Sequence, residues 1–228
     1  MFQKLLHKLK GPNKSDHSIE NYLAKFLKNN SDVFFIQIGS NNGINNDPLR
    51  KFITSYSLKG ILIEPVKYIF DELRQNYAGN KNLIFENIAV AESDGVRPFY
   101  RLKKIDGRTL PIWYDQLGSF LLDVILKHKE EIPDIEEHII KEEINCLTFQ
   151  SLISKHNIKK VDIIHIDTEG FDFEIIKLID FSLIKPSILI YEHKHLSTED
   201  IYKSTQLLNE VGYSIIEDGS DSLAKIDS

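Results

Sequence analysis

The sequence predicts an α/β fold in which helices cover both faces of a mainly parallel β-sheet that has an antiparallel edge. Two observations lead to this prediction. Short apolar segments suited to buried strands alternate with segments of helical periodicity, which is typical of parallel sheets. The chain then ends with two strand-like segments, YSIIEDG and SLAKID, which indicate a closing hairpin at one edge.

Each element follows from its local pattern. Apolar residues at helical spacing, preceded by Ser18 as N-cap, predict a helix over residues 18–29. Apolar runs predict strands at 33–39, 60–65, 82–90, 161–170 and 187–196, and intervening segments predict helices at 47–56, 66–77, 148–156, 171–181 and 197–212. Glycines and prolines predict an irregular segment at 94–120, whereas 119–129 suits a short helix and 133–145 suits a charged, partly helical segment.

The composition is that of a globular protein with a sizeable core, because 42% of its residues are hydrophobic and 27% are charged. The formal net charge of −6 argues against a general nucleic-acid binder. The single cysteine, Cys146, permits no internal disulfide and favours the cytoplasm. No apolar run approaches the roughly 18 residues of a membrane span, so no transmembrane segment is expected.

The first ten residues form an amphipathic pattern, with leucines on one face and lysines elsewhere. Two interpretations remain open for residues 1–10. They form a helix that packs on the domain or on a partner, or they make a weak contact with an anionic membrane.

A glycine loop follows the first predicted strand, at Gly39 to Gly43. Such a loop lets the backbone approach a nucleotide closely, although a tight turn alone would also require glycine. Glu64 follows the second strand, 21 positions after Gly43, where a carboxylate of Rossmann-type folds binds ribose hydroxyls. Asn41 replaces the second glycine of the dinucleotide pattern, which disfavours NAD and favours a cofactor without pyrophosphate.

Four segments together resemble the FkbM-type methyltransferase family: FIQIGSNNG, ILIEP, NIAVAESDG and HIDTEGFDFEII. The resemblance spans about residues 33–216. It implies a Rossmann-like methyltransferase fold, S-adenosylmethionine as the methyl donor, and O-methylation of a sugar, a sugar nucleotide or a glycan precursor. We therefore expect residues 1–30 to form an N-terminal helical segment and residues 31–228 a methyltransferase domain, with 94–145 inserted on its substrate side.

The resemblance also implies which residues hold the cofactor. They are Gly39, Ser40, Asn41 and Gly43 at its methionine part, Glu64 at the ribose, and Asn87, Ile88 and Ala89 near the adenine. Gln37, also expected at the cofactor, stands where the family often has Asp, and His165 stands where Lys is common. His165 is either functional or a hydrogen-bonded core histidine.

Methyl transfer to a hydroxyl requires alignment of the acceptor and removal of its proton. Candidate groups end the fourth and fifth strands. We hypothesise that His193 or His195 is the base and that Asp167 orients the hydroxyl or the base, because strand alternation puts the two histidines on one face. Alternatively, the histidines are a polar strand end and Asp167 caps the next helix. Asp167, Glu192 and His193 also offer donors to a divalent metal, but the chain lacks tight ligand spacing and no metal is predicted.

Residues 97–120 combine cations with aromatic side chains, which suit phosphate and sugar rings respectively. The candidate substrate-binding residues are Arg97, Arg101, Arg108, Trp113, Ser119 and Glu169. The alternative is a solvated basic loop.

Two other functions remain open at this stage. One is an NAD-dependent oxidoreductase, and the other is a non-catalytic module that binds a nucleotide or a partner. The sequence determines neither the acceptor nor the oligomeric state.

Overall fold

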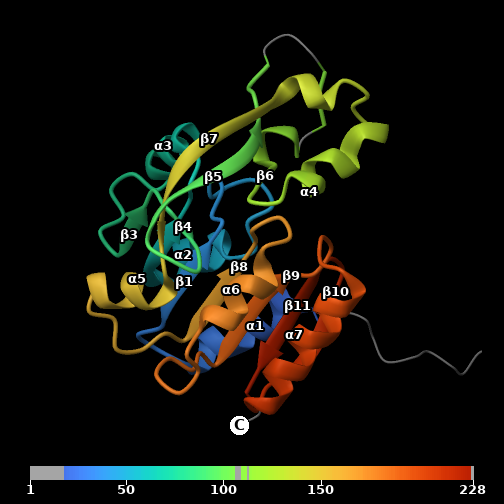
Figure 1. Ribbon diagram of the computed structural model, residues 1–228. Coiled ribbons are helices and arrows are strands. Elements are labelled where there is room, and N and C mark those ends of the chain that lie inside the picture. The colour runs from blue at the N-terminus through green and yellow to red at the C-terminus, as the bar shows by residue number, and fades with distance from the viewer. Residues whose placement is uncertain (1–17, 106–108, 112, 227–228) are drawn as a thin grey trace, which may run out of the picture.

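A computed structural model describes residues 18–105, 109–111 and 113–226 (Figure 1). Its main sheet has seven strands in the order β10-β11-β9-β8-β1-β2-β3. Their bounds are β1 Phe34–Ile38, β2 Lys59–Ile63, β3 Leu83–Glu86, β8 Ile163–Ile166, β9 Ile188–Glu192, β10 Ser214–Asp218 and β11 Asp221–Lys225. The strands from β3 to β9 are parallel, whereas β11 pairs antiparallel with both β9 and β10. This confirms the predicted parallel sheet with an antiparallel edge.

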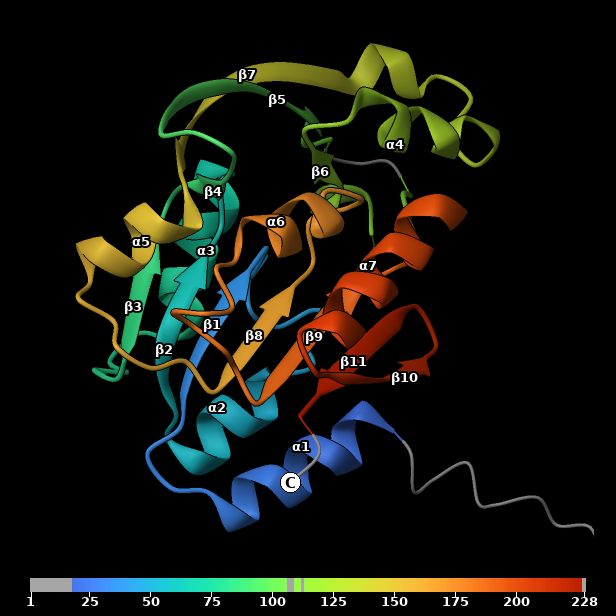
Figure 2. The same ribbon diagram turned by 60° about the horizontal axis from the view of Figure 1, so that its bottom comes forward.

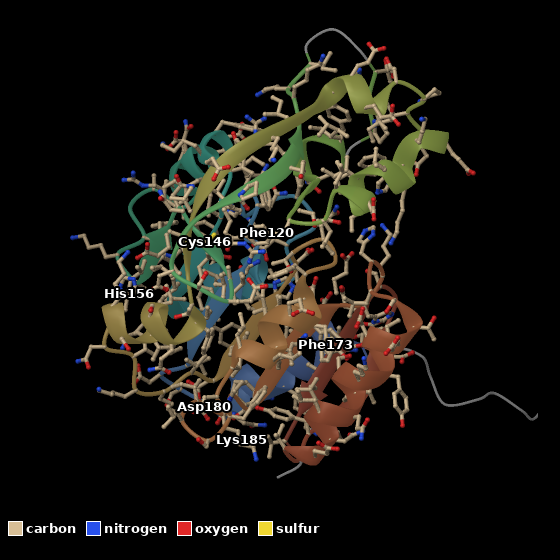
Figure 3. The ribbon with its side chains drawn as sticks, viewed as in Figure 1. Phe120, Cys146, His156, Phe173, Asp180 and Lys185 are labelled. Atoms are coloured by element: carbon tan, nitrogen blue, oxygen red, sulfur yellow. The ribbon has the colours of Figure 1, made fainter. Side chains whose placement is uncertain are left out.

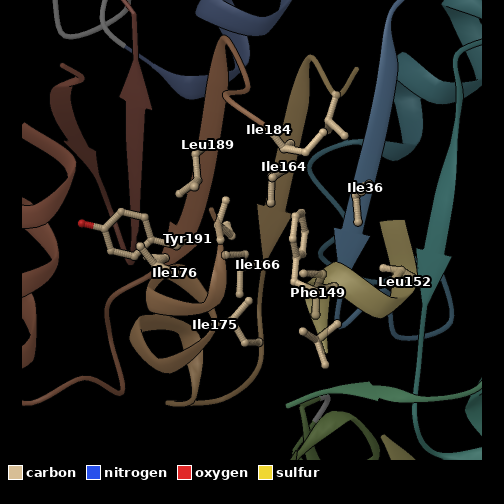
Figure 4. Close-up of a cluster of buried hydrophobic side chains, with 14 of the residues drawn as sticks. Ile36, Phe149, Leu152, Ile164, Ile166, Ile175, Ile176, Ile184, Leu189 and Tyr191 are labelled. Carbon is tan, nitrogen blue, oxygen red and sulfur yellow. The ribbon is translucent and has the colours of Figure 1, made fainter. Parts of the chain in front are cut away.

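Helices cover both faces of this sheet (Figure 2). On one face, a core cluster joins α1 Ile19–Asn29, α2 Arg50–Tyr56 and α3 Lys67–Asn76 to the strands. On the other face, a second cluster joins α5 Phe149–Lys155, α6 Asp172–Leu178 and α7 Thr198–Glu210. Figure 4 shows this second cluster, where Ile175 and Ile176 of α6 meet Ile164, Ile166 and Leu189 of the strands. Burial on both faces explains why these strands are almost entirely apolar.

The predicted helix boundaries agree with the local capping. Ser18, Thr148 and Ser197 each accept a hydrogen bond from the backbone N–H three residues onward, and each begins a helix. None of the helices in the described part of the chain combines the length and the apolar composition that crossing a bilayer requires. Residues 1–10, expected to pack on the domain or to touch a membrane, lie outside the described residues.

A second sheet, which the sequence did not predict, rises above the first (Figure 1). Its order is β4-β7-β5-β6, with bounds β4 Ala89–Val90, β5 Gly95–Leu102, β6 Gly118–Ser119 and β7 Ile139–Leu147. The irregular segment predicted at 94–120 was therefore wrong over β5 and β6, and the partly helical one predicted at 133–145 was wrong over β7. Its helical part is confirmed at Ile135–His138, which form a 3-10 helix. The strands β5 and β7 pair as a ribbon in which many side chains are exposed or half-buried. Their sequences therefore contain charged residues and lack the continuous apolar run that predicts a buried strand. The predicted strand at 82–90 is also divided, with β3 in the main sheet and β4 in the second.

We call the described residues between 95 and 147 the arm. They form β5, β6, β7 and the helices between these strands. The arm has its own small core, which includes Leu102, Tyr114, Ile125 and Ile135. Its described residues form α4 Leu122–Leu126 and the short 3-10 helices η2 Tyr114–Gln116, η3 Lys127–Glu130 and η4 Ile135–His138. The arm therefore holds its side chains as a folded unit above the carboxyl ends of the main strands.

Candidate active site

A cavity of about 320 Å³ lies where the carboxyl ends of the parallel strands meet the arm. The strand order reverses between β1 and β8, and open α/β sheets bind ligands at such a switch point. The lining includes Gly39, Asn41, Glu64, Ile88, Ala89, Trp113, Gln116, Phe120, Asp167, Glu169, Glu192, Lys194 and Asp221. This volume is within the range of cavities that bind one small-molecule ligand.

The loop after β1 forms one wall of the cavity. Gly39 has a φ of +80°, and a Cβ atom there would lie 1.7 Å from the carbonyl oxygen of Asp167. The backbone of the loop therefore touches the turn after β8 directly. Behind the loop, Arg50 donates to the carbonyl of Gly43 at 2.7 Å, and Asn76 donates to that of Asn42 at 2.9 Å. Glycine is required at Gly39 by its positive φ and by this close approach to the turn after β8. The expected close approach to a nucleotide stays a prediction.

Glu64 stands beside this loop at the end of β2. One of its carboxylate oxygens accepts from the backbone N–H of Asn41 at 3.0 Å, and the other accepts from that of Val66 at 2.8 Å. The side chain is fixed in this orientation at the cavity wall. Burial raises the pKa of the Glu64 carboxyl to about 7.

Several residues predicted to bind the cofactor lie behind the residues that line the cavity. Ser40 is buried, donates to the carbonyl of Gln37, and accepts from the backbone N–H of Ile63. Asn87 donates to the carbonyls of Glu64 and Pro65, both at 2.8 Å. These residues shape the loop and the Glu64 segment, whereas Ile88 and Ala89 line the cavity itself.

The two departures from the family pattern, Gln37 and His165, are neighbours. They occupy opposite positions in the register of β1 and β8, and both are almost completely buried. Gln37 donates to the carboxylate of Asp47 at 3.1 Å, and burial lowers the pKa of His165 to about 4. Gln37 Oε1 and His165 Nδ1 have no hydrogen-bond partner among the described residues. His165 is thus a neutral core residue, and its expected hydrogen bond within the sheet is not made at Nδ1.

Carboxylates gather where β8, β9 and β11 border the cavity, on the other side of β1 from Glu64 in the strand order. We call this part the acidic end of the cavity. Asp167 and Glu169 follow β8, Glu192 ends β9, and Asp221 begins β11. Burial and the adjacent negative charges of Glu169 and Glu192 raise the pKa of Asp167 well above its usual range. Burial also raises the pKa of Glu192 to about 8, with Glu169 as the next cause. This end of the cavity favours groups that donate hydrogen bonds or carry positive charge.

The predicted histidines differ in their relation to the cavity. Strand β9 ends at Glu192, so His193 and His195 both follow it, and the argument from strand alternation was wrong. His195 is nearly buried, and its Nε2 lies 3.1 Å from Glu169 and 3.9 Å from Glu192. His193 lies just beyond the end of β9, where its Nδ1 is 2.9 Å from the hydroxyl of Ser222 in β11. Asp167 does not cap the next helix, because α6 is preceded by Phe171 at its N-cap.

The arm supplies Trp113 to the cavity, as expected, and also Gln116 and Phe120. Figure 3 shows Phe120 between the arm and the main sheet. The ring of Trp113 lies 4.2 Å from that of His128, whose own ring is 6.0 Å from that of His195. Gln116, Phe120 and His128 were missed because only the tertiary fold brings the arm over the strand ends.

The other predicted substrate residues have different surroundings. Arg97 lies over the ring of Phe120 at 4.5 Å and pairs with Glu92, and Arg101 forms a two-pronged ion pair with Glu142. Ser119 is buried and donates to the backbone carbonyl of Glu169 at 2.8 Å, which joins the arm to the loop after β8. Arg108 lies outside the described residues. The guanidinium groups of Arg97 and Arg101 thus serve contacts within the arm and with its neighbours.

Comparisons with known proteins agree with this geometry. The family model described as the methyltransferase FkbM domain matches residues 37–215. The structure of methyltransferase FkbM from Methylobacillus flagellatus KT is similar, with a TM-score of 0.53 and 14% sequence identity over 86% of this chain and 44% of that chain. This chain therefore spans less than half of that structure, and the likeness establishes the fold alone.

Two more distant structures are methyltransferases. One is a precorrin-6y C5,15-methyltransferase from Geobacter metallireducens GS-15, with a TM-score of 0.46 and 10% identity over 92% of this chain and 88% of that chain. The other is an S-adenosylmethionine-dependent O-methyltransferase from Thermotoga maritima, with a TM-score of 0.47 and 9% identity over 92% of this chain and 65% of that chain. A search of curated proteins found no match.

The fold, the glycine loop and the matched family model define the class of protein as a Rossmann-like methyltransferase. Since the model spans most of the sequence, the chain belongs to the FkbM methyltransferase family. Membership implies S-adenosylmethionine as the methyl donor.

Proposed function

We propose that the protein transfers a methyl group from S-adenosylmethionine to a hydroxyl of a sugar, a sugar nucleotide or a glycan precursor. The observation that carries this proposal is a single cavity with two different ends. One end offers the glycine loop and Glu64, which suit the methionine tail and the ribose of the cofactor. The other end offers carboxylates and an aromatic ring, which suit a polyhydroxylated acceptor.

The proposed reaction is an in-line displacement. The acceptor hydroxyl gives its proton to the enzyme, its oxygen forms a bond to the methyl carbon, and the carbon–sulfur bond breaks with its electron pair retained by sulfur. Asp167 suits the role of proton acceptor, because it lines the cavity next to Gly39. Glu169, supported by His195, suits the role of orienting the hydroxyl.

This assignment changes the base that the sequence suggested. Glu169 and Glu192 line the cavity, whereas His195 does not line it and contacts these two carboxylates. His193 hydrogen-bonds to Ser222 of β11. A proton accepted at Asp167 needs no displacement of either histidine. His195 therefore enters the proposal through Glu169, and His193 has no role in it.

The surroundings of the cavity favour an acceptor whose reacting part is neutral. Arg97 and Arg101 already pair with Glu92 and Glu142, while the acidic end would repel a phosphate. Trp113 offers a flat apolar face of the kind that sugar rings contact. We further propose a cytoplasmic location, which the single cysteine favours.

A methyl-transfer screen tests the proposal. Purified protein is incubated with S-adenosylmethionine labelled in its methyl group and with nucleotide-activated sugars or cell-envelope glycans. The expected result is label in an alkali-stable methyl ether on a sugar carbon. Labelling confined to protein or RNA would overturn the sugar assignment while leaving the methyltransferase intact.

A further inference from the structure

Three potential metal-binding side chains converge beside the cavity. Glu169 comes from the turn after β8, Glu192 from the last position of β9, and His195 from the loop beyond it. One donor atom from each lies within 4.8 Å of the others. Glu192 and His195 are three residues apart, whereas Glu169 comes from another segment, so only the fold brings the three together.

An incomplete set of contacts accompanies this cluster. Glu192 Oε2 is buried and has no hydrogen-bond partner among the described residues. His195 Nε2 lies 3.9 Å from this oxygen, which is too far for a hydrogen bond. A buried carboxylate oxygen normally has a partner, and a cation is one that satisfies it without a change in the fold.

A second unsatisfied group lies next to His195. His128 Nε2 is buried without a hydrogen-bond partner in the described part of the chain, and its ring is 6.0 Å from that of His195. The arm thus places a second imidazole near the cluster. Asp167 adds a further carboxylate on the cavity side.

We propose that Glu169, Glu192 and His195 bind one divalent cation beside the acceptor end of the cavity. Two carboxylates with one imidazole suit Mn²⁺, which accepts both oxygen and nitrogen ligands. Water or an acceptor hydroxyl would complete the coordination. The proposal rests on the proposed function only for the ion's role, which is to bind the acceptor oxygen and lower the pKa of its hydroxyl.

Manganese binding can be measured without any acceptor. Free Mn²⁺ gives a strong paramagnetic resonance signal that falls on binding, so a titration of the purified chain with MnCl₂ counts sites and gives their affinity. We expect one saturable site per chain. Glu169→Gln and Glu192→Gln should each weaken it on the order of tenfold or more, because each removes a charged ligand.

Glu199→Gln is the matched control, since Glu199 is an exposed carboxylate on α7 that pairs only with Lys203 in the described structure. It should leave Mn²⁺ affinity unchanged. Thermal unfolding of each variant shows whether it is folded. A chain without a saturable site, or one whose site survives both Glu169→Gln and Glu192→Gln, would overturn the proposal.

The two proposals fail separately. Methyl transfer that proceeds unchanged in EDTA, with no Mn²⁺ bound, would leave the proposed function standing and remove the metal site. Stoichiometric Mn²⁺ binding that depends on Glu169 and Glu192, with no methyl transfer to any glycan, would support the metal site and count against the sugar acceptor.

Discussion

Glu64 is the residue on which the cofactor end of the cavity depends most. Backbone N–H groups of Asn41 and Val66 already bind its two oxygens, so its carboxylate needs no rearrangement to receive a ligand. Each oxygen keeps a further lone pair for a ribose hydroxyl. Its raised pKa, about 7, gives this contact a testable pH dependence.

The affinity for S-adenosylmethionine should fall as the pH is lowered through 7. Ribose hydroxyls donate hydrogen bonds, so they favour the deprotonated Glu64, which predominates above its pKa and is lost below it. Calorimetric titrations should show a total loss of about tenfold between pH 8 and pH 6, because the deprotonated fraction of Glu64 falls from about 90% to about 10% over this range. Glu64→Gln should bind more weakly and without this dependence. An equally steep dependence in the variant would assign the effect to another group.

Gln37 and His165 should behave as a coupled pair. Gln37→Asp places a carboxylate beside Asp47 in the core, which should cost about 3 kcal/mol or more of unfolding free energy. Adding His165→Lys supplies an opposite charge at the facing register position and should recover much of that loss. Urea unfolding of the wild type, both single variants and the double variant measures the coupling. Strictly additive effects would show that the two positions are independent.

At the scale of elements, the loop between β1 and α2 is held by contacts on both sides. Gly39 faces the backbone of the turn after β8, whereas α2 and α3 support the loop from behind. The two strand ends are therefore locked in one arrangement, and each depends on the other.

Gly39→Ala tests this contact. The new methyl group would collide with the Asp167 carbonyl, so we expect a loss of about 2 kcal/mol or more in stability and strongly weakened cofactor binding. Gly79→Ala is the matched control, because Gly79 has nearly the same φ, +84°, but nothing within 4 Å of its added Cβ. Thermal unfolding and calorimetry compare the two variants. Equal losses would mean that backbone strain, and not the collision, determines the effect.

The main sheet could be predicted from the sequence because its strands are continuous apolar runs, as in β1 and β9. The ribbon of β5 and β7 could not, since long-range pairing stabilises it and its exposed side chains are charged. The same contrast holds within the site. Gly39 and Glu64 belong to local sequence patterns. The position of Gln116 in the cavity and the contact of Glu169 with His195 arise only when the chain folds.

At the scale of the whole molecule, the cavity lies between the main sheet and the arm, and each contributes different residues to its lining. The main sheet presents the cofactor loop and most of the carboxylates, and the arm closes over them with Trp113 and Gln116. Ser119 connects the two parts through the carbonyl of Glu169. We expect the acceptor to reach the methyl group from the arm side.

Asp167→Asn should separate binding from chemistry. The variant keeps the size of the side chain but removes the proposed proton acceptor, so turnover should fall by about 10²- to 10⁴-fold. The affinity for S-adenosylmethionine should change far less, because Glu64 and the loop remain. Turnover and calorimetry on the same preparation check this prediction. Unchanged turnover would transfer the base to another residue.

The most direct test of the account is a crystal structure of the protein with S-adenosylhomocysteine bound. The account predicts that the ribose hydroxyls contact Glu64, that the amino-acid tail lies along the loop from Gly39 to Gly43, and that the sulfur faces Asp167. A ligand bound outside this cavity, or one with its ribose at the acidic end, would contradict it.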